Sequence, residues 1–372
     1  MKIALVHDQL QEFGGAERVL VALKQIYPEA DVYTSFYNPA GLGTHRSLIE
    51  GWNVHTSWAQ DVPLLPKLYS PLRFITPLIW ESIDFKGYDL VISSSGAYMC
   101  KGIVTRPETV HICYCHHQPR YLYYYETARE WQKHKLVEMY GNLINHDLRM
   151  WDYLGSQRVD HFIANSEETK RRIQKFYRRD SEVIYPPVSV PKNISTPFHY
   201  SSNSHYITVS RLARAKHIDL LIEAANKFHF ELKIVGGGRD EQRLKSMAGK
   251  TVEFLGNVTD DQLKALYTSA RGFLFSAVDE EFGIAPIEAM GYGLPVIGFA
   301  SGGVKETIKH GVNGFLYTDL LPEAIYKQVQ TLERLSETKY EQMSAAACAS
   351  SQQYSQESFK KQITAFVQKR VT

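Results

Sequence analysis

The sequence has few cysteines and no long apolar run. Four cysteines in 372 residues are too few for a disulfide framework, so we expect a protein of a reducing compartment. No stretch of about 18 apolar residues is present, which argues against a membrane-spanning helix. The apolar run at residues 3–6 is too short for a signal peptide. These absences predict a cytoplasmic protein.

The sequence also lacks a charge imbalance. It has 42 Lys and Arg against 40 Asp and Glu, a formal net charge of +2. This balance argues against a protein that binds long nucleic acid through its overall field. The G-x-G-x-x-G fingerprint is absent as well, which disfavours a dinucleotide dehydrogenase. A hydrophobic content of 44% and a charged content of 22% are typical of a globular protein.

Short apolar segments alternate with helical periodicity in two blocks, and the length favours two domains. In the first, residues 1–186, we expect strands at 3–6, 89–93, 110–115 and 161–164 and helices at 16–26, 126–150 and 167–177. In the second, residues 205–354, we expect strands at 206–209, 231–235, 252–255, 272–275 and 295–298, and helices at 216–228, at 260–269, from Pro286 and from Val304. Residues 187–204, rich in proline and serine, predict a linker, and residues 322–371 are expected to be helical.

This alternation predicts an α/β protein with two doubly wound parallel-sheet domains. In such sheets, ligands bind beyond the carboxyl ends of the strands. The residues that directly follow each predicted strand are therefore the candidates for a functional site.

Two motifs of the first block follow strands. Gly14 and Gly15 separate a strand from a helix, where backbone amides favour an anion, although a plain tight turn has the same composition. The run 113–117, Cys-Tyr-Cys-His-His, ends another strand, and its spacing does not match a zinc site with two ligand pairs, so we expect no metal. His116 is either a proton carrier or hydrogen-bond donor in a cleft, or a buried structural histidine.

The second block has a basic and an acidic motif. Arg211 and Lys216 flank the loop after its first strand, which suits a diphosphate or else is a solvated basic loop. Glu280 and Glu288 flank a tight turn at Gly283 and can accept hydrogen bonds from sugar or ribose hydroxyls. The alternative for Glu288 is an acid in the first turn of a helix, stabilised by the helix dipole.

Glycine pairs complete the candidates. Gly302 and Gly303 lie between a strand and a helix and form a second candidate phosphate cradle. Residues 236–238 are three consecutive glycines at another strand end.

These motifs together resemble family 4 glycosyltransferases over nearly the whole chain. In the second block the resemblance rests on Arg211 with Lys216, Glu280 and Glu288 around Phe282-Gly283, Gly293-Leu294-Pro295, Gly302-Gly303 with Glu306, and residues 311–315. In the first block it rests on residues 14–18, Cys115-His116 with Pro119-Arg120-Tyr121, residues 164–166 and residues 184–187. The resemblance implies the GT-B architecture, with two Rossmann-like domains facing a cleft and a C-terminal helix, residues 355–372, that crosses back to the first domain.

The resemblance also implies a role for each candidate. His116 and Glu280 would be catalytic, beside the transferred sugar. The donor would be held by Arg211, Lys216, Glu288, Gly283, Ile284, Gly14 and Gly15. Gly302, Gly303 and Arg120 would lie in loops near the acceptor or the diphosphate. His117-Gln118 departs from the family, in which a small residue and a proline are common, and both strand alternation and motif position favour His116 over His117.

The function implied is that of a retaining glycosyltransferase that needs no metal or cofactor. The resemblance is to bacterial mannosyltransferases of O-antigen and exopolysaccharide assembly. It implies GDP-mannose as the donor and a glycan or polyprenyl-diphosphate-linked oligosaccharide as the acceptor. The alternatives are a UDP-sugar-dependent transferase of the same fold, or a non-catalytic protein that binds nucleotide sugars.

Two segments of the first block suggest a membrane surface. Residues 64–80 are apolar and aromatic, with Lys67 and Arg73 among them, and six cations lie within residues 170–179. We expect these segments to lay the first domain on the anionic inner face of the plasma membrane. The alternative is a loop packed on the core and a solvated helix face.

Overall fold

The computed structural model describes residues 1–127, 133–191 and 205–371. The chain divides into two compact units. The first contains Met1–Tyr125, Glu130–Pro187 and Gln356–Thr372, and the second contains Glu126–Arg129 and Val188–Ser355. Of the predicted linker, residues 192–204 lie outside the described residues. No helix in the described ranges is both long and apolar enough to cross a bilayer.

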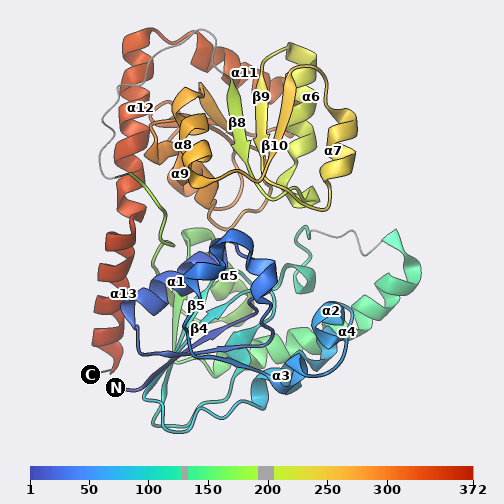
Figure 1. The fold of residues 1–372 in the computed structure, drawn as a ribbon, viewed down its shortest axis with the longest axis vertical. Helices are drawn as coiled ribbons and strands as arrows, with labels where there is room; N and C mark the ends of the chain where they lie inside the picture. Colours follow the sequence, from blue (N-terminus) through green and yellow to red (C-terminus); the bar gives the residue numbers. More distant parts are fainter. Residues whose placement is uncertain (128–132, 192–204, 372) are drawn as a thin grey trace. The chain divides into compact units, whose positions relative to one another are not determined.

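The first unit is built on a seven-stranded parallel sheet in the order β3-β2-β1-β4-β5-β6-β7. Its neighbouring strands β4 and β5 are labelled in Figure 1. Its strands are β1 (Ile3–His7), β2 (Asp31–Thr34), β3 (Val54–Thr56), β4 (Leu90–Ser95), β5 (Val110–Cys115), β6 (His161–Ala164) and β7 (Ser181–Val183). Its α-helices are α1 (Gly15–Ile26), α2 (Leu65–Leu68), α3 (Thr76–Glu81), α4 (Lys135–Gln157), α5 (Glu167–Tyr177) and α13 (Gln356–Val371).

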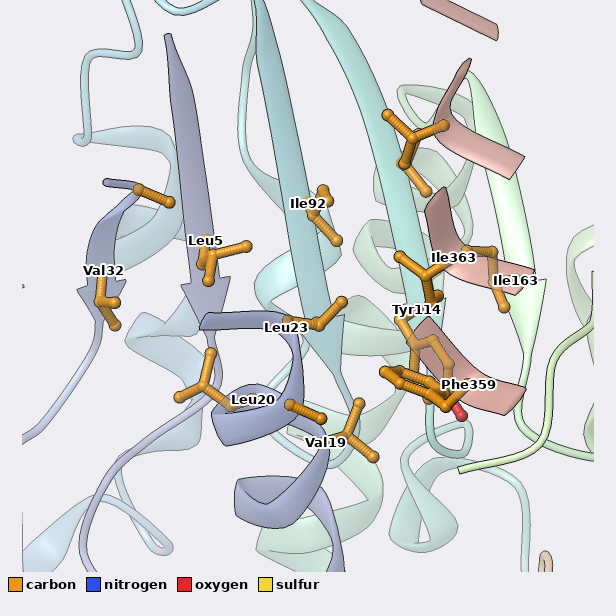
Figure 2. Packing of buried hydrophobic residues seen from close by; sticks show 14 of the residues in the cluster. Leu5, Val19, Leu20, Leu23, Val32, Ile92, Tyr114, Ile163, Phe359 and Ile363 are labelled. Carbon is orange, nitrogen blue, oxygen red and sulfur yellow. The ribbon is translucent and has the colours of Figure 1, made fainter. Parts of the chain in front are cut away.

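The core of this unit explains why the C-terminal helix belongs to it. Leu20 and Leu23 of α1 pack on the sheet beside Leu5, and Phe359 and Ile363 of α13 pack next to Tyr114 on the same face (Figure 2). Cys113 and Cys115 point to the opposite face, into a cluster with α5. Tyr114 and the two cysteines therefore face opposite sides of the sheet, because successive strand residues alternate.

The second unit is a six-stranded parallel sheet in the order β10-β9-β8-β11-β12-β13. Its strands are β8 (Tyr206–Val209), β9 (Leu232–Val235), β10 (Val252–Gly256), β11 (Gly272–Phe275), β12 (Val296–Phe299) and β13 (Gly314–Tyr317). Its helices are α6 (Ile218–Phe228), α7 (Glu241–Met247), α8 (Asp260–Ser269), α9 (Ile284–Gly291), α10 (Val304–Thr307), α11 (Pro322–Glu333) and α12 (Glu337–Ser351). The predicted α/β class with two doubly wound parallel sheets is confirmed.

The strand order reverses once in each sheet, between β1 and β4 in the first unit and between β8 and β11 in the second. At such a point the connections leave in opposite directions, so the loops beyond the carboxyl ends of the two strands splay apart and leave room for a ligand. A ligand site is therefore expected at these two positions.

Several predicted elements were wrong in extent. The helix expected at 126–150 runs from Lys135 to Gln157, and residues 128–132 lie outside the described part of the chain. The helical tail is three helices. The Ser336 hydroxyl accepts from the amide of Lys339 and begins α12, and a 3₁₀ turn, Gln352–Tyr354, separates α12 from α13. Strands β2, β3, β7 and β13 and helices α2, α3 and α7 were not predicted.

Helix α9 begins two residues earlier than expected. Gly283, with a φ of +88°, is its N-cap, and Ile284 is its first residue. Glu288 is therefore the fifth helical residue, in the second turn, and not a first-turn acid. The dipole explanation for Glu288 loses force, because that effect is confined to the first turn.

Candidate functional site

Three polar side chains of the first unit lie close to the point where its strand order reverses. His7, the last residue of β1, is the register partner of Ser94 on β4. His116 directly follows β5, the next strand of the sheet, and its amide donates to the Ser95 carbonyl oxygen over 2.8 Å. Three neighbouring strands thus deliver these side chains to one sheet edge.

A continuous series of hydrogen bonds joins these residues. His116 Nε2 lies 2.7 Å from Ser94 Oγ, and the same Oγ lies 3.0 Å from His7 Nδ1. His7 Nε2 lies 3.3 Å from Oε1 of Glu17, on the first turn of α1. The two histidines and Ser94 are buried, with exposed fractions of 7%, 1% and 1% for His116, His7 and Ser94.

The glycine loop is joined to the same series. The Gly14 amide donates to Glu17 Oε2 over 2.8 Å, so one carboxylate serves both the helix start and His7. The Gly14 amide, predicted to face the donor, is thus used inside the unit. Gly15 is the first residue of α1, and Arg120 begins a half-buried 3₁₀ turn, Arg120–Leu122, after β5.

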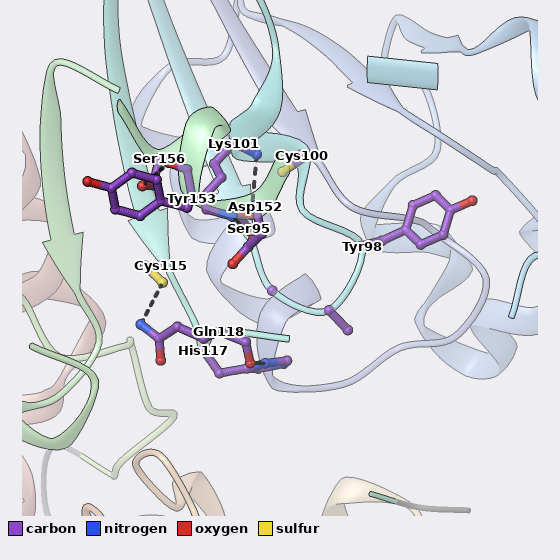
Figure 3. A network of polar contacts seen from close by, with 12 residues as sticks. Ser95, Tyr98, Cys100, Lys101, Cys115, His117, Gln118, Asp152, Tyr153 and Ser156 are labelled. Atoms are coloured by element: carbon purple, nitrogen blue, oxygen red, sulfur yellow. Dashed lines mark hydrogen bonds and ion pairs between the residues drawn. The ribbon is translucent and has the colours of Figure 1, made fainter. Parts of the chain in front are cut away.

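The residues after His116 take a different course. His117 Nδ1 lies 2.8 Å from the carbonyl oxygen of Gln118, and the Gln118 amide is directed back toward Cys115 (Figure 3).

Burial raises the pKa of the Cys113 thiol to about 12 and that of Cys115 well above its usual value. Both cysteines are therefore protonated at neutral pH, a poor state for a thiolate ligand or nucleophile.

A buried ion pair supports the loop that follows β4. Lys101 and Asp152 of α4 form this pair, with side-chain exposures of 2% and 0% (Figure 3). Asp152 also accepts the Tyr123 hydroxyl over 2.7 Å. The start of the same loop is fixed by Asp8, whose carboxylate accepts from the amides of Gly96, Tyr98 and Cys100 over 2.8–2.9 Å.

In the second unit a cation and a carboxylate meet at the other reversal point. Lys216, in the turn after β8, donates from Nζ to Oε2 of Glu280, in the loop after β11, over 2.6 Å. Their side chains are 21% and 19% exposed. Ser276 ties the two loops together, because its hydroxyl donates to the carbonyl oxygens of Lys216 and His217.

Glycines after β12 hold the Glu280 loop. Gly302 has a φ of +59°, and a Cβ there would lie 1.9 Å from the Glu280 carbonyl oxygen. The Gly303 amide donates to that same oxygen over 2.8 Å. The pair predicted as a phosphate cradle therefore packs against the backbone of Glu280, with Gly283 and Ile284 at the start of α9 next along the chain.

The loop of Arg211 is held by the three glycines after β9. The Leu212 amide donates to the Gly237 carbonyl oxygen over 2.9 Å. Gly236 has a φ of +116°, and a Cβ there would lie 2.1 Å from the Ser210 carbonyl oxygen. Arg211 itself is exposed at this edge.

The predicted residues thus form one group in each unit. His116, Gly14, Gly15 and Arg120 belong to the first, and Arg211, Lys216, Glu280, Gly283, Ile284, Glu288, Gly302 and Gly303 belong to the second. Sequence reasoning missed His7 and Ser94 and gave Glu17 no separate role. The sequence feature that could have identified them is a histidine at the end of one strand and the run Ser93-Ser94-Ser95 at the end of another. No group of three or more histidine, cysteine or acidic residues arranged to hold a metal occurs in the described part of the chain.

Two family models match the chain in succession. "Glycosyltransferase Family 4" matches residues 13–191, and "Glycosyl transferases group 1" matches residues 192–349. Together they span both groups of candidate residues.

Curated relatives share modest identity. The GtfA subunit of the UDP-N-acetylglucosamine–peptide N-acetylglucosaminyltransferase of Streptococcus pneumoniae is 23% identical over 76% of this chain and 55% of that protein. The α-1,3/1,6-mannosyltransferase ALG2 of Homo sapiens is 30% identical over 42% of this chain and 46% of that protein. Its Schizosaccharomyces pombe counterpart is 25% identical over 85% and 70%. The chain spans about half the length of the first two.

Solved structures share the fold over nearly the whole chain. Anabaena Alr3699/HepE in complex with UDP has a TM-score of 0.72 at 20% identity and covers 99% of this chain and 100% of that one. The sucrose-phosphate synthase of Thermosynechococcus elongatus has a TM-score of 0.70 at 16% identity, covering 99% of each. At these identities the likeness establishes the fold.

Proposed function

We propose that this chain, which belongs to glycosyltransferase family 4 and has the GT-B fold, is a retaining glycosyltransferase. The proposed reaction moves mannose from GDP-mannose to a glycan or to a polyprenyl-diphosphate-linked oligosaccharide. Its proposed role is in cell-surface polysaccharide synthesis. One observation carries the proposal. Lys216 and Glu280 form an ion pair at the carboxyl edge where the second sheet reverses its strand order.

This ion pair suits the charge changes of glycosyl transfer. When the sugar leaves, negative charge builds up on the nucleoside diphosphate. Lys216 is one neutralising cation, and Arg211, exposed in the same connection after β8, is a second. In this proposal the two side chains take the place of a divalent metal, and Glu280 accepts from hydroxyls of the bound sugar. Glu288, half-buried on α9, accepts from the ribose.

The relatives and neighbours favour two different donor sugars. The human and fission-yeast proteins are named as α-1,3/1,6-mannosyltransferases, which favours a mannosyl donor. The streptococcal relative is named for UDP-N-acetylglucosamine, and the Anabaena structure holds UDP, which favours the alternative of a UDP-sugar. We keep GDP-mannose as the proposal because the motifs resemble those of mannosyltransferases.

A nucleotide panel tests the donor. We expect GDP to raise the melting temperature, GDP-mannose to raise it further, and UDP, ADP and CDP to have little effect. A ligand at 100 times its dissociation constant stabilises the folded state by about 2.7 kcal/mol. The variant Lys216→Met is expected to lose most of the shift, whereas Lys227→Met, which removes an exposed pair with Glu323, keeps it. A shift with UDP alone would replace the donor, and no shift with any nucleotide would refute the proposal.

The acceptor is proposed to be lipid-linked because the first unit has an apolar surface. Exposed apolar side chains lie on the segment of α2 and α3 and along α4. A hydrogen bond joins the two segments, because the Tyr140 hydroxyl donates to the Pro71 carbonyl oxygen over 2.6 Å. The exposed residues are Leu64, Leu68, Phe74, Leu78, Leu136, Met139, Leu143, Met150 and Leu154. A patch of this kind is typical of an interaction surface.

The second segment proposed for the membrane is less suited to it. On α5, Lys170 pairs with Glu167, and Arg171 and Arg172 both pair with Glu168. Two carboxylates thus offset part of the positive charge of this segment, so we propose that contact with the cytoplasmic face of a membrane depends mainly on the surface formed by α2, α3 and α4.

Vesicle co-sedimentation tests this surface. We expect binding to vesicles that contain anionic lipid, and loss of binding in Met139→Ser/Leu143→Ser. The matched control is Leu320→Ser/Leu321→Ser, which removes two exposed leucines of the second unit. Equal binding by all three proteins, or no binding at low salt, would refute the membrane contact and leave the donor chemistry intact.

A further inference from the structure

The hydrogen-bonded series in the first unit has a direction, which begins at Glu17. An ionised carboxylate only accepts hydrogen bonds, and Glu17 already accepts from the Gly14 amide through Oε2. The contact of Oε1 with His7 Nε2 therefore requires the proton to be on that nitrogen.

The remaining links follow from the chemistry of a neutral imidazole. With the proton on Nε2, His7 Nδ1 is an acceptor, so the Ser94 hydroxyl donates to it. The oxygen of Ser94 then has only lone pairs for its other contact, which is with His116. His116 must carry its own proton on Nε2, the nitrogen that faces Ser94.

We propose that Glu17 and His7, acting through Ser94, are positioning residues that hold His116 in its Nε2–H tautomer and fix its ring orientation. The effect on turnover rests on the proposed function, in which His116 lies beside the transferred sugar. The tautomer itself is a property of the protein alone.

Burial makes the arrangement stringent. His7, Ser94 and His116 are each less than one-tenth exposed, and the Glu17 side chain is 12% exposed. Water cannot readily replace a lost partner there, and a donor that faces another donor is costly in such surroundings. Reversing one link therefore reverses the others.

An isosteric change at one end should reverse the whole series. In Glu17→Gln the amide oxygen can keep the bond to the Gly14 amide, and the NH₂ group then faces His7 Nε2. His7 takes the Nδ1–H tautomer, Ser94 donates to His116 instead of accepting from it, and His116 moves its proton to Nδ1. The side chain that changes is three hydrogen bonds away from the ring that responds.

Nitrogen-15 NMR of histidine-labelled protein measures this directly, because protonated and unprotonated ring nitrogens resonate at well-separated shifts. The signals of His116 are assigned among the 14 histidines by their loss in His116→Gln. We expect Nε2–H in the wild type, Nδ1–H in Glu17→Gln, and a mixture in Ser94→Ala, in which the link is cut. Glu29→Gln, the same substitution at an exposed site just after α1, is the control and should leave the signals unchanged.

Kinetics of the same variants supply the second readout. We expect Glu17→Gln to lower kcat by about 10- to 100-fold, the range found when the partner that orients a metal-binding histidine is removed. The KM for the donor should stay within about twofold, because Lys216 and Arg211, the proposed diphosphate contacts, belong to the second unit and the bond of the Gly14 amide is kept.

The outcomes separate this inference from the proposed function. Unchanged His116 signals in both Glu17→Gln and Ser94→Ala would overturn the positioning role, whatever the activity. A shifted tautomer in a protein that transfers no sugar would keep the positioning role and refute the function. If Glu17→Gln does not fold, Ser94→Ala alone decides, because loss of the single tautomer is expected there and its persistence would overturn the inference.

Discussion

Removal of the buried cation Lys101 is the sharpest stability prediction of the first unit. In Lys101→Met, the carboxylate of Asp152 is left with the Tyr123 hydroxyl as its remaining partner among the hydrogen bonds described for it. Burial alone lowers the pKa of Lys101, but the charge of Asp152 and the hydrogen bond between them raise it overall. Lys101 is therefore charged at neutral pH, and its removal leaves the buried carboxylate of Asp152 without its counter-ion.

The expected cost follows from this burial. Breaking a buried pair by removing one partner typically costs about 3–5 kcal/mol, and the exposures of 2% and 0% place this pair at the buried extreme. Replacing both partners removes the stranded charge. We therefore expect Lys101→Met/Asp152→Leu to be more stable than Lys101→Met, even though the double variant differs from the wild type at two positions.

Urea unfolding followed by tryptophan fluorescence suits this test. All five tryptophans precede residue 153 in the sequence, so their fluorescence reports on the first unit. Trp151 adjoins the pair itself, since a Cβ at Gly102 would lie 2.3 Å from its ring. A loss below about 1 kcal/mol in Lys101→Met, or a double variant less stable than Lys101→Met, would refute the reasoning.

Two further predictions concern a buried histidine and a strained glycine. Burial lowers the pKa of His111 to about 3, so between that value and about 6.5 the unfolded chain binds more protons. Stability should fall as the pH falls through this window, by up to about 1.4 kcal/mol per unit, and His111→Gln should show a shallower slope in urea titrations at pH 7 and pH 5. Gly302→Ala should displace the Glu280 loop and weaken the thermal shift with GDP, since its Cβ would meet a backbone oxygen at 1.9 Å. Gly311→Ala, with a φ of +78° and nothing near its Cβ, controls for backbone strain, and equal shifts in both variants would contradict the account.

The strands that the sequence predicted well are those buried on both faces. The bounds of β5, β6, β8 and β11 match the expected residues, because continuous apolar runs mark strands covered by helices on both sides. The missed strands β2, β3 and β7 are only partly buried and contain polar residues, so no continuous apolar run marks them. The start of α9 was placed at Pro286 because proline favours the first turn, whereas the helix begins at Ile284 after the N-cap Gly283.

The candidate site was predictable in its parts but not in its connections. Arg211, Lys216, Glu280 and His116 could be found because they follow strands in a fixed order. The bond between Lys216 and Glu280 joins residues 64 positions apart, and that between His7 and Ser94 joins residues 87 apart. Such pairs depend on which strands are neighbours in the sheet, and one sequence contains no direct signal for that.

The central claim is that the protein transfers a sugar from GDP-mannose. The most direct measurement is the release of GDP from GDP-mannose with a lipid-linked glycan acceptor, followed in the wild type and in His116→Ala, with GDP binding measured on both. We predict acceptor-dependent release by the wild type, and unchanged GDP binding with release reduced at least about 100-fold in His116→Ala. Undiminished release by His116→Ala would remove this histidine from the mechanism. A wild type that binds GDP but releases none from GDP-mannose would contradict the claim itself.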